Sequence, residues 1–384
     1  MAKFRVRFLA PGMFLVLCGV NALAASPDDG FTFAYKPGKG FQIQTADGSH
    51  ALSVGGRIQL RYTAADLEEE KDRSTFRVQR ARFWFVGHVY DPRLRYGFQG
   101  DIADDFELRD AYLEIAHLER AVLKLGQYKV PFNRQQLTSS ARLQFVDRSI
   151  TNAEFLFGDD GRDVGAMIYG DLRPDLLAYQ VGVFNGSGPN TVNDNASHLV
   201  VGRLLFTPLG PFEDYYSEGD QVGERRARFG IGVAAGFEAD EKRGRTVERT
   251  GLVALPGFRE ADILGVTADA QFKYAGFSVL GDYHFRRVDP DGSGLSSFDA
   301  HGFVVQAGYY LVPQKLEIAA RYAWVDRNDD VGDNGEREYG GALAYYISGH
   351  NLKIQADLRE VDRERPGADT KNDLEGRLQI QAIF

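Results

Sequence analysis

The side chains best suited to chemistry in this sequence are arginines that recur at even spacing. Arg57 and Arg61 are four residues apart, and Arg80 and Arg82 are two apart. Within a β-strand, each pair would therefore lie on one face. Arginine stays charged and presents a flat fork of donors to phosphate or carboxylate oxygens. This spacing favours binding of anions along one face of a sheet.

A second basic group lies in the longest connection of the first half, Pro131 to Arg162. It carries Arg134, Arg142 and Arg148, with Lys129 at its base. Two interpretations stay open for these arginines. They could line an anion path, or they could pair with carboxylates of the same loop and only brace it. The carboxylates in question are Asp147, Glu154, Asp159 and Asp160.

No arrangement of residues predicts an enzyme. The sequence has no Gly-x-Ser-x-Gly elbow, no His-Glu-x-x-His, and no P-loop or dinucleotide fingerprint after a strand. The single cysteine, Cys18, lies near the N-terminus. The chain carries 45 Lys and Arg against 54 Asp and Glu, and this acidic balance argues against a nucleic-acid partner. We expect no cofactor and no metal.

The N-terminus has the three parts of a secretory signal peptide. Lys3, Arg5 and Arg7 precede a short apolar core at residues 8–20, and Ala22-Leu23-Ala24 fits a small-residue cleavage site. A membrane anchor would need about 20 uninterrupted apolar residues, and this run is shorter. We therefore expect residues 1–25 to be removed on export.

The elements that must position the basic residues are alternating strands. Residues 52–62 alternate apolar Leu52, Val54, Ile58, Leu60 and Tyr62 with mainly polar residues, over the length of a strand that crosses a membrane. Similar segments recur to the C-terminus. They centre on residues 80–85, 94–102, 110–115, 123–128, 164–168, 177–183, 200–206, 229–237, 264–272, 277–285, 303–311, 316–324, 339–347, 352–358 and 374–384.

This pattern predicts an all-β protein, a transmembrane antiparallel β-barrel of about 16 strands. Short turns alternate with longer loops, as periplasmic turns and extracellular loops do. We expect an N-terminal periplasmic segment at residues 26–50 and the barrel at residues 51–384. The long connection Pro208 to Arg226 breaks the alternation, and the strand at 200–206 is ambiguous because Leu199, Val201 and Leu205 share a face with Arg203.

Strand phase predicts a pore wall with more basic than acidic side chains. The basic set is Arg57, Arg61, Arg80, Arg82, Arg95, Arg203, Lys273, Arg286, Arg321, Lys353, Arg359 and Arg377. The acidic set is Asp101, Asp110, Glu114, Asp269, Asp282, Glu317, Asp357 and Glu375. A slip of one residue would exchange the two faces of any strand.

The sequence resembles a known family, the phosphate-selective porins O and P. The stretch Gly126-Gln127-Tyr128-Lys129-Val130-Pro131-Phe132 carries the resemblance, together with Leu137 to Ser140, Arg148-Ser149 and Phe184 to Gly188. The resemblance implies a trimeric 16-stranded porin of the bacterial outer membrane, in contact with lipid and lipopolysaccharide. It also implies a third extracellular loop folded into the pore, and basic side chains that select small anions such as phosphate or polyphosphate.

The residues we expect on the anion path are Lys129, Arg134, Arg142, Arg148, Arg57, Arg61, Arg80, Arg82 and Arg95. The lysines that the family places near its constriction have no secure counterpart here, and only Lys124 and Lys129 lie near the third loop. Three alternatives stay open: a general or differently selective porin, an outer-membrane barrel enzyme, and an adhesin.

Overall fold

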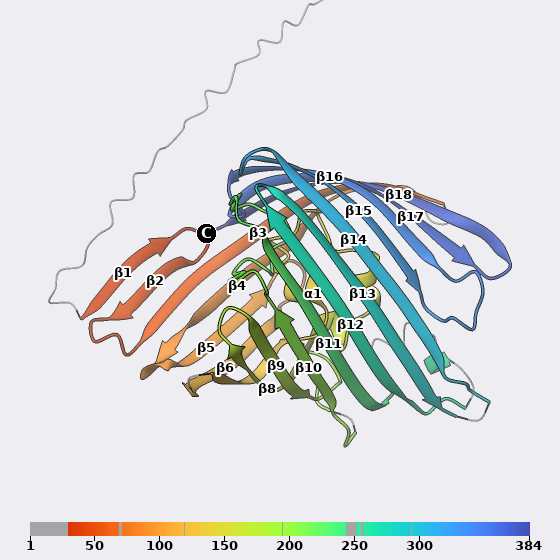
Figure 1. The fold of residues 1–384 in the computed structure, drawn as a ribbon, viewed down its shortest axis with the longest axis horizontal. Helices are drawn as coiled ribbons and strands as arrows, with labels where there is room; N and C mark the ends of the chain where they lie inside the picture. The colour runs from red at the N-terminus through yellow and green to blue at the C-terminus, as the bar shows by residue number, and fades with distance from the viewer. Residues whose placement is uncertain are drawn as a thin grey trace, which may run out of the picture.

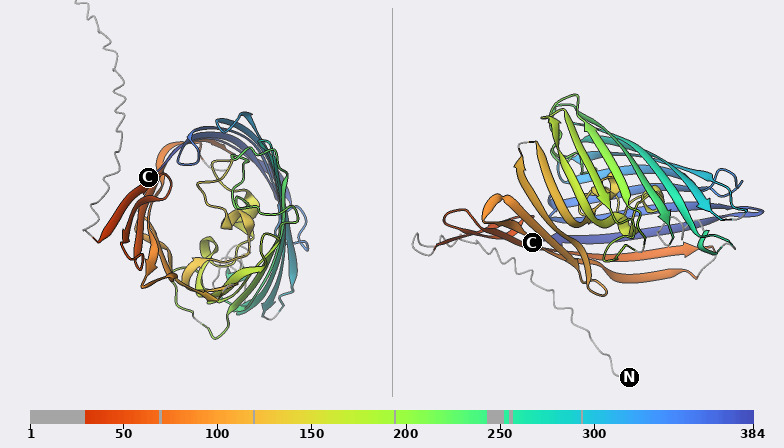
Figure 2. Two further views of the ribbon diagram at one scale, coloured as in Figure 1. Left: turned by 60° about the vertical axis from the view of Figure 1, so that its left-hand side comes forward. Right: turned by 90° about the horizontal axis from the view of Figure 1, so that it is seen from below.

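The computed structural model describes residues 30–68, 71–118, 120–193, 195–242, 252–254, 257–292 and 294–384. The expected signal peptide, residues 1–25, lies outside these described residues. Strands β3 to β18 form one closed antiparallel barrel of 16 strands (Figures 1 and 2). The last strand pairs with the first of the barrel, from Asp373 opposite Leu67 to Ile383 opposite Arg57. The predicted fold class is confirmed.

The barrel strands of the first half are β3 (Ala51–Leu67), β4 (Arg73–Val89), β5 (Asp91–Asp101), β6 (Glu107–Leu118), β7 (Ala121–Lys129), β8 (Arg162–Arg173), β9 (Leu177–Phe184) and β10 (Leu199–Phe206). Those of the second half are β11 (Arg228–Glu241), β12 (Glu260–Tyr274), β13 (Phe277–Asp291), β14 (Phe298–Val312), β15 (Leu316–Asp326), β16 (Glu336–Ser348), β17 (Leu352–Arg365) and β18 (Ala368–Ile383). Each contains one of the alternating segments of the sequence.

The helices are short. They are α1 (Arg134–Leu137), α2 (Ile150–Glu154), η1 (Asp159–Gly161) and η2 (Leu252–Ala254). Among the described residues, none is long and apolar enough to cross a membrane.

Alternation along each strand separates a lumen face from an outer face. In β3, Arg57 and Gln59 are 6% and 0% exposed, whereas Ile58 and Leu60 are 41% and 47% exposed. Exposed aliphatic side chains on a closed barrel form the band that contacts lipid. The inner face of the same strand carries the charged and amide groups.

One irregularity changes the strand phase within β4. In the pairing of β3 with β4, Gln59 lies opposite Arg80 but the next residue, Leu60, lies opposite Val78. This β-bulge accommodates one extra residue in β4. Arg77 therefore lies opposite the inward-facing Arg61, although Arg77 and Arg80 are an odd number of residues apart.

Short and long connections segregate to opposite ends of the barrel, as predicted, with the long connection between β10 and β11 as the exception. Ala275 and Gly276, with φ of 50° and 88°, form a two-residue turn between β12 and β13. Positive φ at both positions is what this tight hairpin requires. The C-terminus lies at the same end as the short turns (Figure 1). In outer-membrane barrels this is the periplasmic end.

A hairpin precedes the barrel and was not anticipated from the sequence. Strands β1 (Phe31–Lys36) and β2 (Gly40–Thr45) pair with each other, and β2 then pairs with the first residues of β3. Phe41 of β2 lies opposite Val54 of β3, whereas the pairing of β18 with β3 ends at Ile383 opposite Arg57. Strand β2 therefore pairs with the part of β3 that β18 leaves uncovered. The hairpin thus extends the barrel wall at its periplasmic end.

The two ambiguous features of the sequence have one explanation. The connection between β10 and β11, residues 207–227, lies at the periplasmic end but is folded into the lumen, where Tyr215 and Glu218 are 1% and 0% exposed. Leu199 and Val201 of β10 also face inward and are fully buried. Both exceptions to the pattern arise because the lumen is filled by protein rather than by water alone.

Candidate functional site

The third loop, residues 130–161 between β7 and β8, fills the centre of the barrel. Helix α1 belongs to this loop and lies within the ring of strands (Figure 2, left). Phe145 and Phe155 of the loop are 0% and 2% exposed. The inward-folded third loop expected from the sequence is therefore present in the structure.

An apolar cluster holds one side of the loop to the wall. The rings of Phe132 and Phe157 meet edge to face at 4.8 Å, and both pack in one buried cluster with Leu199 and Val201. A Cβ atom at Gly236 of β11 would lie 2.5 Å from the ring of Phe157. A glycine is needed there because the loop packs directly on the backbone of the strand.

Buried ion pairs hold the same side. Arg134 Nε donates to Asp282 Oδ1 at 3.0 Å, and neither side chain is exposed. Arg286 Nη2 donates to Glu154 Oε1 at 2.7 Å. Charges that are removed from water must be paired in this way. These pairs make Arg134 a brace of the loop.

The opposite side of the loop crosses the seam between β3 and β18. Gln59 Nε2 of β3 donates to Gln381 Oε1 of β18 at 2.6 Å and to the carbonyl of Ser140 at 3.3 Å. Gln381 donates to the carbonyl of Ala141 at 3.3 Å. Arg61 contacts the carbonyl of Val146 at 3.2 Å. The loop is thus bonded to both strands that close the barrel.

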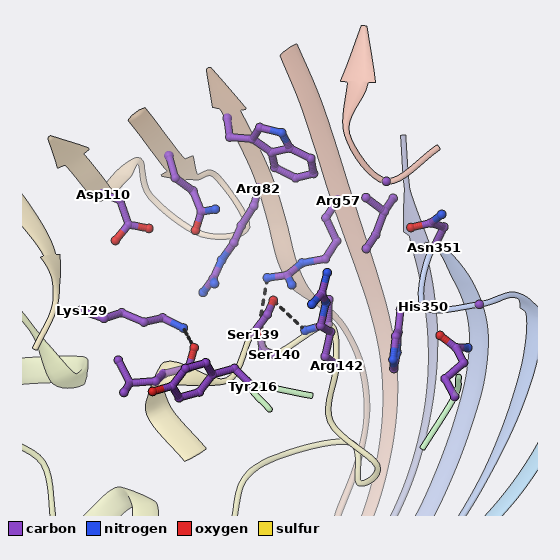
Figure 3. A pocket seen from close by; sticks show the side chains of 18 of the residues that line it. Arg57, Arg82, Asp110, Lys129, Ser139, Ser140, Arg142, Tyr216, His350 and Asn351 are labelled. Atoms are coloured by element: carbon purple, nitrogen blue, oxygen red, sulfur yellow. Dashed lines mark hydrogen bonds between the residues drawn. The ribbon is translucent and has the colours of Figure 1, made fainter. Parts of the chain in front are cut away.

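Between the loop and the wall formed by β3 to β8 lies a cavity of about 620 Å³, which we call the basic cavity. Five basic side chains line it: Arg57, Arg82, Lys129, Arg142 and Arg162. Asp110 is the single carboxylate among its described lining residues. Figure 3 shows Lys129 pointing into the cavity from the side opposite Arg57 and Arg142. The cavity therefore carries an excess of positive charge.

Three of these cations have no carboxylate partner among the described residues. Arg57 Nη2 donates to Ser140 Oγ at 3.0 Å. Lys129 Nζ donates to the carbonyls of Leu137 and Thr138 at 3.1 and 3.4 Å. The side chain of Arg142 is exposed to the cavity. Neutral oxygens orient these groups without cancelling their charge, so an anion in the cavity would be attracted to them.

The remaining predicted cations are more tightly compensated. Arg61 and Arg80 share Asp147, at 2.8 and 3.2 Å. Arg82 pairs with Asp101 at 2.6 Å. These ion pairs reduce the net charge of the wall.

Neither Arg148 nor Arg95 is among the described residues that line the basic cavity. Arg148 donates to the carbonyls of Gln135 and Thr138 at 2.7 and 2.8 Å. Burial, followed by the charge of Arg80, lowers the pKa of the Arg148 guanidinium to about 10, so it remains charged at neutral pH. Arg95 pairs with Glu114 at 3.1 Å and lines a second cavity of about 370 Å³. We call this second space the periplasmic cavity, because residues at the periplasmic ends of β7, β8, β9 and β10 line it.

Sequence reasoning missed several lining residues. Arg162 faces the basic cavity and pairs with Asp110 at 3.1 Å. Its even spacing from Ala166 and Ile168, which are exposed on the outer face, would have placed it outside, so strand phase did not reveal it. Tyr216 and His350 come from connections at the periplasmic end, where no alternation exists to reveal which side chains point inward.

Comparison with known proteins supplies the family context. The model of the family described as phosphate-selective porin O and P matches residues 52–384. Porin O of Pseudomonas aeruginosa is 22% identical over 92% of this chain and 90% of its own length. An uncharacterized protein of Aquifex aeolicus is 21% identical over 87% of this chain and 77% of its own length.

Solved structures share the fold. The anion-selective porin from Comamonas acidovorans superposes with a TM-score of 0.61 at 14% identity, over 87% of this chain and all of that one. The trimer form of OmpT from Vibrio cholerae gives a TM-score of 0.52 at 13% identity, over 88% of this chain and all of that one. At such identities the likeness concerns the barrel architecture.

Proposed function

The chain belongs to the phosphate-selective porin O and P family, and from that premise we propose that it conducts small anions, with phosphate and polyphosphate as the best-fitting class, through the basic cavity. It is an outer-membrane porin and not an enzyme. The family model identifies the class of protein, and our proposal concerns the solute that it conducts.

One observation carries the proposal. Inside a protein of net charge −9, the described residues that line a cavity of about 620 Å³ include five cations and one carboxylate, and Arg82 and Arg162 are the two of these cations that pair with carboxylates. Arg57, Lys129 and Arg142 of that cavity have no carboxylate partner among the described residues. A partly desolvated excess of like charge is costly unless counterions enter. Mobile anions are the counterions that a water-filled pore offers.

The lining chemistry suits oxyanions in particular. Arg57 and Arg142 offer planar guanidinium forks, and Lys129 offers a compact ammonium. Ser139 and Ser140 add hydroxyl groups at the same surface. Several weak sites in series raise the local anion concentration and still permit release. Transport would be passive diffusion down a gradient.

We also infer that the protein assembles as a homotrimer in contact with outer-membrane lipid and lipopolysaccharide. The support is the trimer form of OmpT, a barrel of the same architecture. A room-temperature SDS gel band near three times the monomer mass would agree with this assembly. A monomeric band under equally mild conditions would contradict it.

Reversal potentials in planar bilayers with asymmetric KCl test the anion path. We expect a chloride-selective potential, and we expect added phosphate to reduce the chloride current. The triple variant Arg57→Ala, Lys129→Ala, Arg142→Ala should lose most of both effects. Arg93→Ala is the matched control, because it removes an exposed arginine paired with Asp91 outside the cavity. A cation-selective potential in the wild type would refute the proposal.

A further inference from the structure

We propose that Tyr216 is a specificity-determining residue of this channel, which limits the size of anions that pass between the basic cavity and the periplasmic cavity. The inference rests on the proposed anion path. Tyr216 belongs to residues 207–227, which we call the inward strap. This segment is long where the other periplasmic connections are short, and the barrel needs no such length to join β10 to β11.

The strap is fixed inside the lumen by buried polar contacts with the wall. Lys273 Nζ of β12 donates to Asp214 Oδ2 and to the carbonyl of Ser217, both at 2.8 Å. Gln271 Nε2 donates to the carbonyls of Ser217 and Glu218 at 2.8 and 2.9 Å. Arg228 pairs with both Asp214 and Asp220. A segment held by this many buried polar contacts is expected to be rigid rather than mobile.

The strap is also bonded to the third loop. The backbone N–H of Glu218 donates to the carbonyl of Arg142 at 3.1 Å. Glu218 Oε2 accepts from the N–H of Gln144 at 2.9 Å and from Gln306 Nε2 at 3.0 Å. The strap therefore sets the position of Arg142, one of the cations that face the basic cavity. The pore is constricted by two elements, one from each end of the barrel.

Tyr216 is the strap residue that faces both cavities. It lines the basic cavity of about 620 Å³ and the periplasmic cavity of about 370 Å³. Figure 3 shows its ring beside Lys129 at the edge of the basic cavity. The phenol is held in place: Arg203 Nε donates to its oxygen at 3.3 Å, and the ring of Tyr215 packs against it at 5.3 Å and 88°. The ring thus forms a fixed partition.

The side chains beyond this partition continue a basic surface. Arg95, Arg120 and Arg203 line the periplasmic cavity, with Asp171 as its described carboxylate. Arg95 pairs with Glu114 and Arg203 pairs with the buried Asp269, whereas Arg120 has no carboxylate partner among the described residues. An anion that passes Tyr216 would therefore move from the unpaired cations of the basic cavity toward Arg120 of the periplasmic cavity. Arginines line both cavities and the aromatic ring between them carries no charge, so we expect the ring to discriminate anions by size. This separates the role of Tyr216 from that of the arginines.

The test compares the conductance of a large anion, gluconate, with that of chloride in single channels. Tyr216→Ala removes the ring and should raise the gluconate-to-chloride ratio several-fold. Tyr216→Trp enlarges the ring and should lower the ratio below that of the wild type. Tyr216→Phe should leave it almost unchanged, because the ring stays. Glu213→Gln is the control: this exposed strap residue loses a charge outside either cavity.

The sign of the reversal potential in a KCl gradient keeps the two proposals apart. It should stay chloride-selective in all four variants, because no cavity cation is removed. A cation-selective wild type would refute the anion path and leave the size measurement valid. A gluconate-to-chloride ratio that is the same in the wild type, Tyr216→Ala and Tyr216→Trp would overturn the role of Tyr216.

Discussion

Arg134 of the third loop and Asp282 of β13 form an ion pair in which neither side chain is exposed, with Nε 3.0 Å from Oδ1. The pair joins the loop that fills the pore to the wall of the barrel. Removing one partner leaves the other as a buried, uncompensated charge, which typically costs about 3–5 kcal/mol.

We therefore expect Asp282→Ala to lower the free energy of unfolding by about that amount and to make single-channel currents noisier, because the loop loses an anchor. Urea unfolding in detergent and bilayer recording measure the two effects. The exposed pair of Arg93 and Asp91 is the control, and Asp91→Ala should change the free energy of unfolding much less, because solvent screens an exposed ion pair. Equal losses in the two variants would contradict the brace.

Asp147 is expected to moderate selectivity, because its single negative charge pairs with both Arg61 and Arg80 and offsets part of their charge. Asp147→Asn keeps an acceptor oxygen but removes the charge. The reversal potential should shift further toward the chloride potential. Asp330→Asn makes the same change of charge in an exposed outer loop and should shift it much less. Equal shifts would mean that only the total charge matters.

Acidification should not reproduce the effect of Asp147→Asn. Burial alone would raise the pKa of Asp147, but the charges of Arg80 and Arg61 hold it well below its usual range. The stabilisation from these pairs is therefore present in full above about pH 4, the unfolded pKa, and is lost only as the pH falls further. Asp147 should therefore contribute no difference between the reversal potentials of the wild type at about pH 7 and about pH 5. A wild type that reaches the Asp147→Asn value at the lower pH would contradict this.

Phe157 is expected to be a major apolar anchor of the third loop. Phe157→Ala would leave a cavity between Phe132 and the strands, at a typical cost of about 3–5 kcal/mol. The midpoint of urea unfolding measures this loss. Phe76→Ala removes a ring that is 84% exposed on β4, so it should change the midpoint little.

Phe384 is expected to matter for barrel assembly. Its N–H donates to the carbonyl of Gly56 at 2.9 Å, and the N–H of Gly56 donates back to its carbonyl at 2.8 Å. These two hydrogen bonds continue the pairing of β18 with β3 at the seam that closes the barrel. Deleting Phe384 should sharply lower the yield of folded barrel on unheated SDS gels. Leu378→Ala, an outward-facing change on the same strand, should assemble normally.

The strands could be predicted because lipid and water impose a two-residue period on every one of them. Arg57 and Arg61 were placed on the inner face by that period alone. The third loop has no period, so nothing in the sequence distinguished Arg134, which is buried against Asp282, from Arg142, which faces the cavity. The choice between brace and path depends on partners more than 100 residues away in the chain.

The inward strap escaped prediction for a related reason. Its length was visible in the sequence, but its direction was not, since a long connection can extend into the periplasm or fold back. Leu199 and Val201 were ambiguous because a lumen was expected to be polar. Their partners are Phe132 and Phe157 of the third loop, which make that part of the lumen an ordinary protein core.

The contacts of the third loop across the seam of β3 and β18 bear on how the protein is made. Gln59 and Arg61 of β3 hydrogen-bond to glutamines of β18. The same two side chains also donate to backbone carbonyls of the third loop. An open sheet would lack both sets of hydrogen bonds, so we expect closure of the barrel and docking of the third loop to stabilise each other. A closed barrel with an undocked loop would leave these buried side chains without part of their hydrogen bonds, which disfavours a wide, unobstructed pore.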